Sequence, residues 1–165
     1  MIGLPWIQTI GASTGVIVAL ASPNQTQRPY HWGRVLRHEF SHVLTLQATQ
    51  FNIPHWYTEA LAVRIEGSEF PADWEELLLA RQPKGELFNL DTINDGFRKP
   101  KGPDDWTLAY CQASLYAAYL EQTYGAEANA RLLTAFREGK STEESLHDLF
   151  SVTKSDFEAG YREFL

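Results

Sequence analysis

The chain has 165 residues, of which 44% are hydrophobic and 13% aromatic, enough apolar side chain for one packed domain. Its 14 Lys and Arg residues and 21 Asp and Glu residues give a formal net charge of −7. This balance argues against nucleic-acid binding, because phosphate contacts need clustered cations. The single cysteine, Cys111, excludes an internal disulfide, and the longest apolar run, residues 15–21, is too short to span a bilayer. We expect one domain over residues 1–165, cut from a longer protein, with no nucleic-acid partner and no transmembrane segment.

The predicted elements begin with a strand over residues 14–21, which is rich in β-branched residues, and continue with a polar turn over 24–30. From about Trp32 to Thr49 the apolar residues recur with a helical period, which predicts an amphipathic helix. Further helices are expected at about 55–66, 73–81, from Asp104 or Asp105 to just before Gly125, at about 126–138, and after the caps Ser141 and Thr153. Residues 82–104, rich in proline and glycine, are predicted to form an ordered surface loop.

His38-Glu39-Phe40-Ser41-His42 lies inside the first predicted helix and has the H-E-x-x-H pattern of zinc peptidases. Residues four apart lie on one face of a helix, about one turn apart, so both imidazoles can reach one ion. Glu39 projects about 100° further round the helix, where it can reach a zinc-bound water without binding the ion. The pattern predicts His38 and His42 as zinc ligands and Glu39 as the general base.

A catalytic zinc also needs a third protein ligand and an open position. The three-histidine extension of the motif fails here, because Thr45 and Ala48 stand where it requires glycine and histidine. A carboxylate from the second helix is the alternative. The chain can reverse at residues 50–54, and an antiparallel return at about 8–10 Å would bring Glu59 beside the histidine pair. Glu59 is therefore the predicted third ligand.

These segments, His-Glu-Phe-Ser-His-Val-Leu-Thr-Leu-Gln and Ile-Pro-His-Trp-Tyr-Thr-Glu-Ala-Leu-Ala-Val, resemble the gluzincin zinc metallopeptidases. More closely, they are similar to the peptidase-MA-like domains found at the C-terminal end of bacterial tetratricopeptide-repeat proteins, in which Pro-x-Trp-x-x-Glu-Gly-Leu-Ala supplies the third ligand. The resemblance extends from about Gly11 to the C-terminus and departs at Ala60, where glycine is usual. It implies a mainly helical α+β, zincin-like fold with a small N-terminal β element, an H-E-x-x-H helix, a glutamate-ligand helix and a C-terminal helical subdomain.

The resemblance also implies Zn²⁺, a peptide or protein substrate, and hydrolysis through a zinc-bound water with Glu39 as base. Family members place a tyrosine from a later helix against the oxyanion, and Tyr110 is the best match, with a plain core position as the alternative. An edge strand beside the zinc helix pairs with the substrate backbone in gluzincins, which gives residues 14–21 that role or the role of a core strand. Some gluzincins orient a histidine with an acid four residues after the glutamate ligand. Val63 stands there, so no partner is identified, and Glu66, an acid two turns after Glu59, is not assigned the role.

Two other interpretations stay open. One is a metal-stabilised binding or scaffolding domain without turnover, and the other is a helical adaptor without metal. The intact Glu39 favours the peptidase, because a scaffold needs ligands but no base. His31, His55 and His147 are expected to be surface or loop residues. A tetratricopeptide-repeat region in the parent protein is implied by the resemblance, and export of that parent would place the domain in the cell envelope or periplasm.

Overall fold

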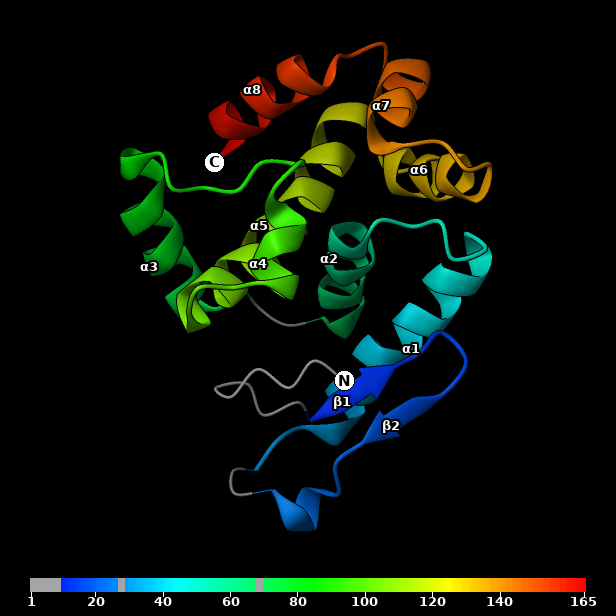
Figure 1. Ribbon diagram of the computed structural model, residues 1–165, viewed down its shortest axis with the longest axis vertical. Helices are drawn as coiled ribbons and strands as arrows, with labels where there is room; N and C mark the ends of the chain where they lie inside the picture. The colour runs from blue at the N-terminus through cyan, green and yellow to red at the C-terminus, as the bar shows by residue number, and fades with distance from the viewer. Residues whose placement is uncertain (1–9, 27–28, 68–69) are drawn as a thin grey trace.

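A computed structural model describes residues 10–26, 29–67 and 70–165 of the chain and confirms the predicted fold class. A two-stranded sheet lies beside α1 at one end of the molecule, α6 to α8 lie at the other end, and α5 runs between them (Figure 1). The elements are β1 (Gly11–Ser13), β2 (Val18–Leu20), η1 (Pro23–Gln25), α1 (Trp32–Ala48), α2 (His55–Glu66), α3 (Ala72–Arg81), η2 (Gln82–Lys84), α4 (Ile93–Arg98), α5 (Pro103–Tyr124), α6 (Ala128–Arg137), α7 (Thr142–Phe150) and α8 (Lys154–Phe164). Among the described residues, no helix is long and apolar enough to cross a membrane.

The N-terminal β element is a hairpin, which corrects the prediction of one strand over residues 14–21. Strands β1 and β2 pair antiparallel with Ala12 opposite Ala19, and the segment between them turns at Gly15, whose φ is +82°. A left-handed residue ends a strand, and glycine adopts that conformation without steric cost. The side chain of Gln47 donates to the carbonyl of Gly15 over 2.8 Å and ties the turn to α1. The predicted polar turn at 24–30 overlaps η1, while residues 27–28 lie outside the described residues.

Helices α1 and α2 form an antiparallel pair. The chain reverses at Gln50 and Phe51, which both have positive φ, and α2 begins at His55. Contacts between the helices run in opposite directions, since Thr45 meets Thr58 near the turn and His38 meets Glu66 further from it. The reversal that the sequence predicted for this segment is therefore present.

Helix α4 lies inside the segment predicted to be loop, residues 82–104, and corrects that prediction. It is only six residues long and contains Gly96, so its sequence carries no clear helical period. Ile93 and Phe97 of this helix are buried in the main core. The side chain of Asn94 accepts a hydrogen bond from the backbone N–H of Trp56 at 2.9 Å, so α4 caps the N-terminus of α2.

The main hydrophobic core is built around α5. Tyr116 stacks on Tyr161 of α8 with ring centroids 3.7 Å apart. Its hydroxyl donates to Glu158 over 2.7 Å, and the other oxygen of Glu158 accepts from the backbone N–H of Leu90 at 2.6 Å. Because these partly buried polar groups satisfy one another, α8 is fixed to α5, which in turn packs against α2.

Candidate metal centre

Two adjacent helices bring the three predicted ligands together. His38 and His42 lie one turn apart on α1, and Glu59 faces them from α2. Oε2 of Glu59 lies 3.4 Å from Nε2 of His38 and 3.5 Å from Nε2 of His42. One ligand atom from each of the three residues falls within 4.8 Å of the others, so the three could hold a metal ion.

The spacing of these atoms suits a tetrahedral metal. With metal–ligand bonds of about 2.0–2.1 Å and tetrahedral angles, neighbouring ligand atoms lie about 3.3–3.4 Å apart, close to the two separations from Oε2. This oxygen is buried and has no hydrogen-bond partner among the described residues. A buried carboxylate oxygen without a partner is costly, and a cation between it and the two imidazoles would satisfy it. Two imidazoles and one carboxylate are ligands that zinc accepts.

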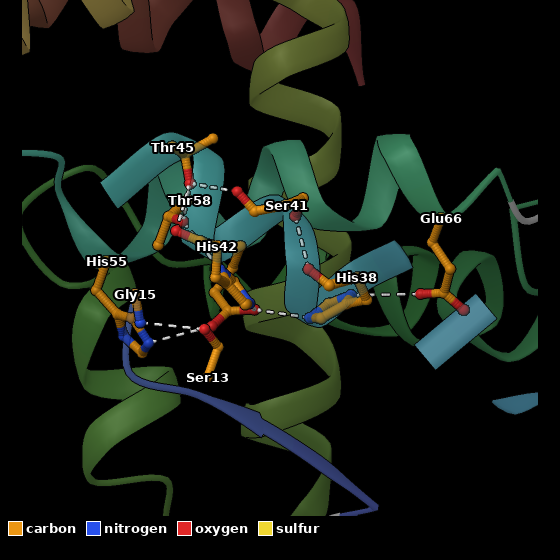
Figure 2. Close-up of polar contacts among 10 residues, drawn as sticks. Ser13, Gly15, His38, Ser41, His42, Thr45, His55, Thr58 and Glu66 are labelled. Atoms are coloured by element: carbon orange, nitrogen blue, oxygen red, sulfur yellow. Dashed lines mark hydrogen bonds and ion pairs between the residues drawn. The ribbon is translucent and has the colours of Figure 1, made fainter. Parts of the chain in front are cut away.

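The imidazole of His38 is oriented from behind by Glu66. Oε2 of Glu66 lies 3.4 Å from Nδ1 of His38, and Oε1 accepts from both Nε and Nη2 of Arg34, at 3.1 and 2.8 Å. The hydrogen bond from His38, with the Arg34 guanidinium behind it, lowers the pKa of Glu66 to about 2. Burial lowers the pKa of His38, but the carboxylates of Glu59 and Glu66 outweigh it and raise that pKa to about 9. In Figure 2 the rings of His38 and His42 lie between Glu66 on one side and His55 on the other.

The imidazole of His42 is oriented by two threonines. Its Nδ1 lies 2.9 Å from Oγ1 of Thr58, which lies 2.8 Å from Oγ1 of Thr45, and Thr45 donates to the carbonyl of Ser41 over 2.9 Å. The carbonyl can only accept, so the Thr45 proton points to it and the Thr58 proton points to Thr45. Nδ1 of His42 must then donate to Thr58. The chain fixes the tautomer that presents an unprotonated Nε2 toward Oε2 of Glu59.

The carboxylate of Glu59 is buried and faces three histidines. Burial alone would raise its pKa, but the imidazoles of His38, His42 and His55, which face it at 3.2–3.5 Å, hold that pKa well below its ordinary value. The residue is therefore an anion in the folded protein. His55, which the sequence placed on the surface or in a loop and not among the ligands, reaches Oε1 of Glu59 with its Nε2 at 3.2 Å.

Glu39 lies between the histidine pair and β1. Its side chain is buried, and burial raises the pKa of the carboxyl, while the charges of His38 and His42 lower it. A Cβ added to Gly11 would lie 2.6 Å from Oε1 of Glu39 and 2.7 Å from a methyl of Val35. Only glycine therefore fits where β1 passes this carboxylate.

Tyr110 extends from α5 toward the same centre. Its ring centroid lies 6.3 Å from that of His38, and the ring packs edge-on against Phe97 and Trp106. Burial and the nearby Glu59 carboxylate raise the pKa of its hydroxyl well above the ordinary value, so the hydroxyl stays protonated. Tyr110, His38 and Glu39 line two cavities, of about 640 and 430 Å³, on the two sides of the histidine pair.

The arrangement thus defines a mainly helical protein with a two-histidine, one-glutamate cluster and a neighbouring carboxylate in an open cleft. The profile described as the peptidase MA superfamily matches residues 16–165, and the chain belongs to this superfamily. No curated protein and no solved structure showed significant similarity to the chain. The superfamily assignment and the cluster agree with a metallopeptidase.

Sequence reasoning missed the groups that orient the histidines. Glu66 is noted in the sequence but not assigned an orienting role there, because the expected acid position, four residues after Glu59, holds Val63. Yet Glu66 lies seven residues after Glu59, two helical turns, and so on the same face of α2. That periodicity was the available signal. Thr58 could have been identified only from the way α2 packs against α1, because a threonine next to a glutamate is not a motif in itself.

Proposed function

We propose that the protein is a zinc-dependent peptidase of the gluzincin type. The observation that carries the proposal is the unpartnered, buried Oε2 of Glu59 lying at tetrahedral spacing from Nε2 of His38 and His42. His38, His42 and Glu59 would hold the ion, and the superfamily assignment supports a peptide or protein as substrate. When bound, zinc would supply a Lewis acid that polarises the scissile carbonyl and lowers the pKa of the attacking water.

The chain's own residues supply the remaining chemistry. Glu39 takes the proton of the attacking water and delivers it to the leaving amine, a role suited to a buried carboxylate with a raised pKa. Tyr110, protonated and adjacent to the cluster, donates a hydrogen bond to the oxyanion that forms. These two residues approach the centre from α1 and α5, so the reacting peptide bond would lie between the two helices.

Strand β1, and not the strand expected over residues 14–21, provides a place for the substrate backbone. It pairs with β2 along one edge, and no described residue pairs with the other. Gly11 of β1 lines both cavities beside Glu39, and an extended peptide can add to such an open edge through backbone hydrogen bonds. Trp74 and Trp106 in the wall of the larger cavity offer apolar surface to a substrate side chain.

Metal content tests the ligand set. Protein purified without added metal is analysed by mass spectrometry, alone and as the variants His38→Ala, His42→Ala and Glu59→Ala. We expect one zinc per wild-type chain and loss of most metal in each variant, with His147→Ala, an exposed histidine, as the control. Stoichiometric zinc in all three ligand variants would exclude the assignment.

Turnover separates the peptidase from a metal-stabilised scaffold. A pool of peptides is incubated with the zinc-loaded protein, and products are identified by mass spectrometry. We expect Glu39→Gln to retain zinc and fold while the cleavage rate falls on the order of 10²-fold or more, because only the base is lost. Cleavage at the wild-type rate in Glu39→Gln would rule out this mechanism. Zinc binding without any cleavage by the wild type would favour the scaffold.

A further inference from the structure

The two oxygens of Glu59 have different environments, although the carboxylate as a whole is buried. Oε1 lies 3.2 Å from Nε2 of His55, while Oε2 has no hydrogen-bond partner and faces the two ligand histidines at 3.4 and 3.5 Å. A carboxylate free at both oxygens could bind a metal through one or both. Here one oxygen is already occupied by a residue outside the ligand set.

His55 is fixed in this position by its neighbours. It is the first residue of α2, one turn before Glu59 and on the same face, so the helix itself directs its ring toward the carboxylate. The ring also packs edge-on against Phe97 of α4, with centroids 5.1 Å apart. The contact with Glu59 is therefore built into the junction between α2 and α4.

The hydrogen-bonding partners of His55 indicate which of its nitrogens carries the proton. Nδ1 is buried and has no partner among the described residues, so a proton there would be an unsatisfied donor. The tautomer with its proton on Nε2 is therefore favoured, and Nε2 then donates to Oε1 of Glu59. This donor keeps Oε1 in place without taking the negative charge away from the carboxylate.

We propose that His55 is a positioning residue that holds Oε1 of Glu59 and reserves Oε2 alone for the metal. The inference rests on the proposed zinc site. A catalytic zinc has three protein ligands and one open position, and a glutamate bound through both oxygens would fill that position. With Oε1 held by His55, Glu59 would bind the zinc through Oε2 alone, and the fourth position would stay open for the reacting water.

The test compares three substitutions of His55. His55→Phe keeps a ring against Phe97 but removes the donor. His55→Gln supplies an amide N–H that can reach Oε1, and His55→Asn supplies the same group on a side chain one methylene shorter. The control is His147→Phe, because the side chain of His147 is 75% exposed and far in sequence from the centre. The zinc dissociation constant is measured by competition with a chromogenic chelator, and the visible spectrum is recorded after loading with Co²⁺.

We expect zinc affinity to fall on the order of 10- to 100-fold in His55→Phe and in His55→Asn, with recovery of most of the affinity in His55→Gln. The visible bands of Co²⁺ should weaken in His55→Phe, because a glutamate bound through both oxygens raises the coordination number above four. His147→Phe should match the wild type in both measurements.

The outcomes separate this inference from the proposed function. Wild-type protein that binds no zinc would overturn both. Tight zinc binding by the wild type with unchanged affinity and spectrum in His55→Phe would overturn the role of His55 and leave the zinc site intact. If His55→Phe fails to fold, the comparison of His55→Gln with His55→Asn decides the question. Equal zinc affinities in these two variants would contradict a role that depends on reaching Oε1.

Discussion

At the scale of single residues, the candidate metal centre depends on how closely the backbone and side chains around it approach one another, as well as on their charge. Glu39 is placed by the absence of a side chain at Gly11, and His38 and His42 are each held from behind by a residue of α2. A metal site with both rings fixed loses little conformational freedom when the ion binds. The candidate ligands are thus held in place by other side chains of the chain itself.

Replacing Gly11 by Ala should impair turnover without removing zinc. The added Cβ would lie within 3 Å of Glu39 and Val35, so the carboxylate must move, whereas none of the three nearest atoms belongs to a candidate ligand. A displacement of this size in a catalytic group costs on the order of 10²-fold in rate. Cleavage rate and zinc content are measured together. Gly102→Ala is the control, because no heavy atom lies within 4 Å of a Cβ built there. Full activity in Gly11→Ala would show that β1 does not constrain the base.

Removing the acid behind His38 should weaken zinc binding. Glu66→Ala leaves Nδ1 of His38 without its acceptor, and loss of such a partner typically costs on the order of 10- to 100-fold in metal affinity. Glu66→Gln retains an oxygen that can accept from Nδ1 and should lose less. Chelator competition gives the dissociation constants, with the exposed Glu86→Ala as the control. Weaker zinc binding by Glu66→Gln than by Glu66→Ala would contradict an orienting role for Glu66.

At the scale of elements, the sequence predicted the helices better than the faces they bury. The apolar period of residues 32–49 correctly indicated α1, yet Leu36, Phe40 and Leu44 are exposed, while the buried face holds Glu39, Ser41, His42 and Thr45. Periodicity identifies a helix, but which side is covered depends on partners distant in sequence. The same limit hid α4, since a six-residue helix has too few turns to show a period.

The cap on α2 shows what sequence could not reveal at this scale. Proline at position 54 gives α2 no side-chain cap, and the acceptor for Trp56 comes from Asn94, 38 residues later. Local motifs such as the capping box at Ser141 are readable, because both partners lie within one turn. A cap supplied by another helix becomes visible only once the fold is known.

Asn94→Ala should destabilise the protein by about 1 kcal/mol, because it leaves a backbone donor at the start of α2 without its acceptor. The free energy of unfolding is measured by urea denaturation of the metal-free protein. Asp95→Ala, an exposed neighbour on the same helix, should change it by less than about 0.5 kcal/mol. Equal stabilities for Asn94→Ala and the wild type would mean that water replaces this cap at no cost.

At the scale of the whole molecule, α1 is held to the fold differently from the helices of the main hydrophobic core. The main hydrophobic core joins α2 and α4 to α8, but among the described residues α1 contributes only Leu46, which is partly buried. Helix α1 is connected to α2 largely through polar side chains, including the histidine, threonine and glutamate contacts of the centre. A metal bound by His38, His42 and Glu59 would therefore join α1 to the rest of the fold.

Metal removal should loosen α1 and leave α5 nearly unchanged. A ligand that binds only the folded form stabilises it by a free energy that grows with the logarithm of the ligand concentration, about 2.7 kcal/mol at 100 times its dissociation constant. Amide hydrogen exchange of zinc-loaded and chelator-treated protein measures this stabilisation for each helix separately, because it distinguishes local opening from global unfolding. We expect amides of α1 to exchange up to about 100-fold faster without zinc, while those of α5, packed in the core, change far less. His38→Ala should show fast exchange in α1 with or without zinc. If α1 and α5 respond to zinc equally, the metal stabilises the fold as one unit and α1 is not the weakly held element.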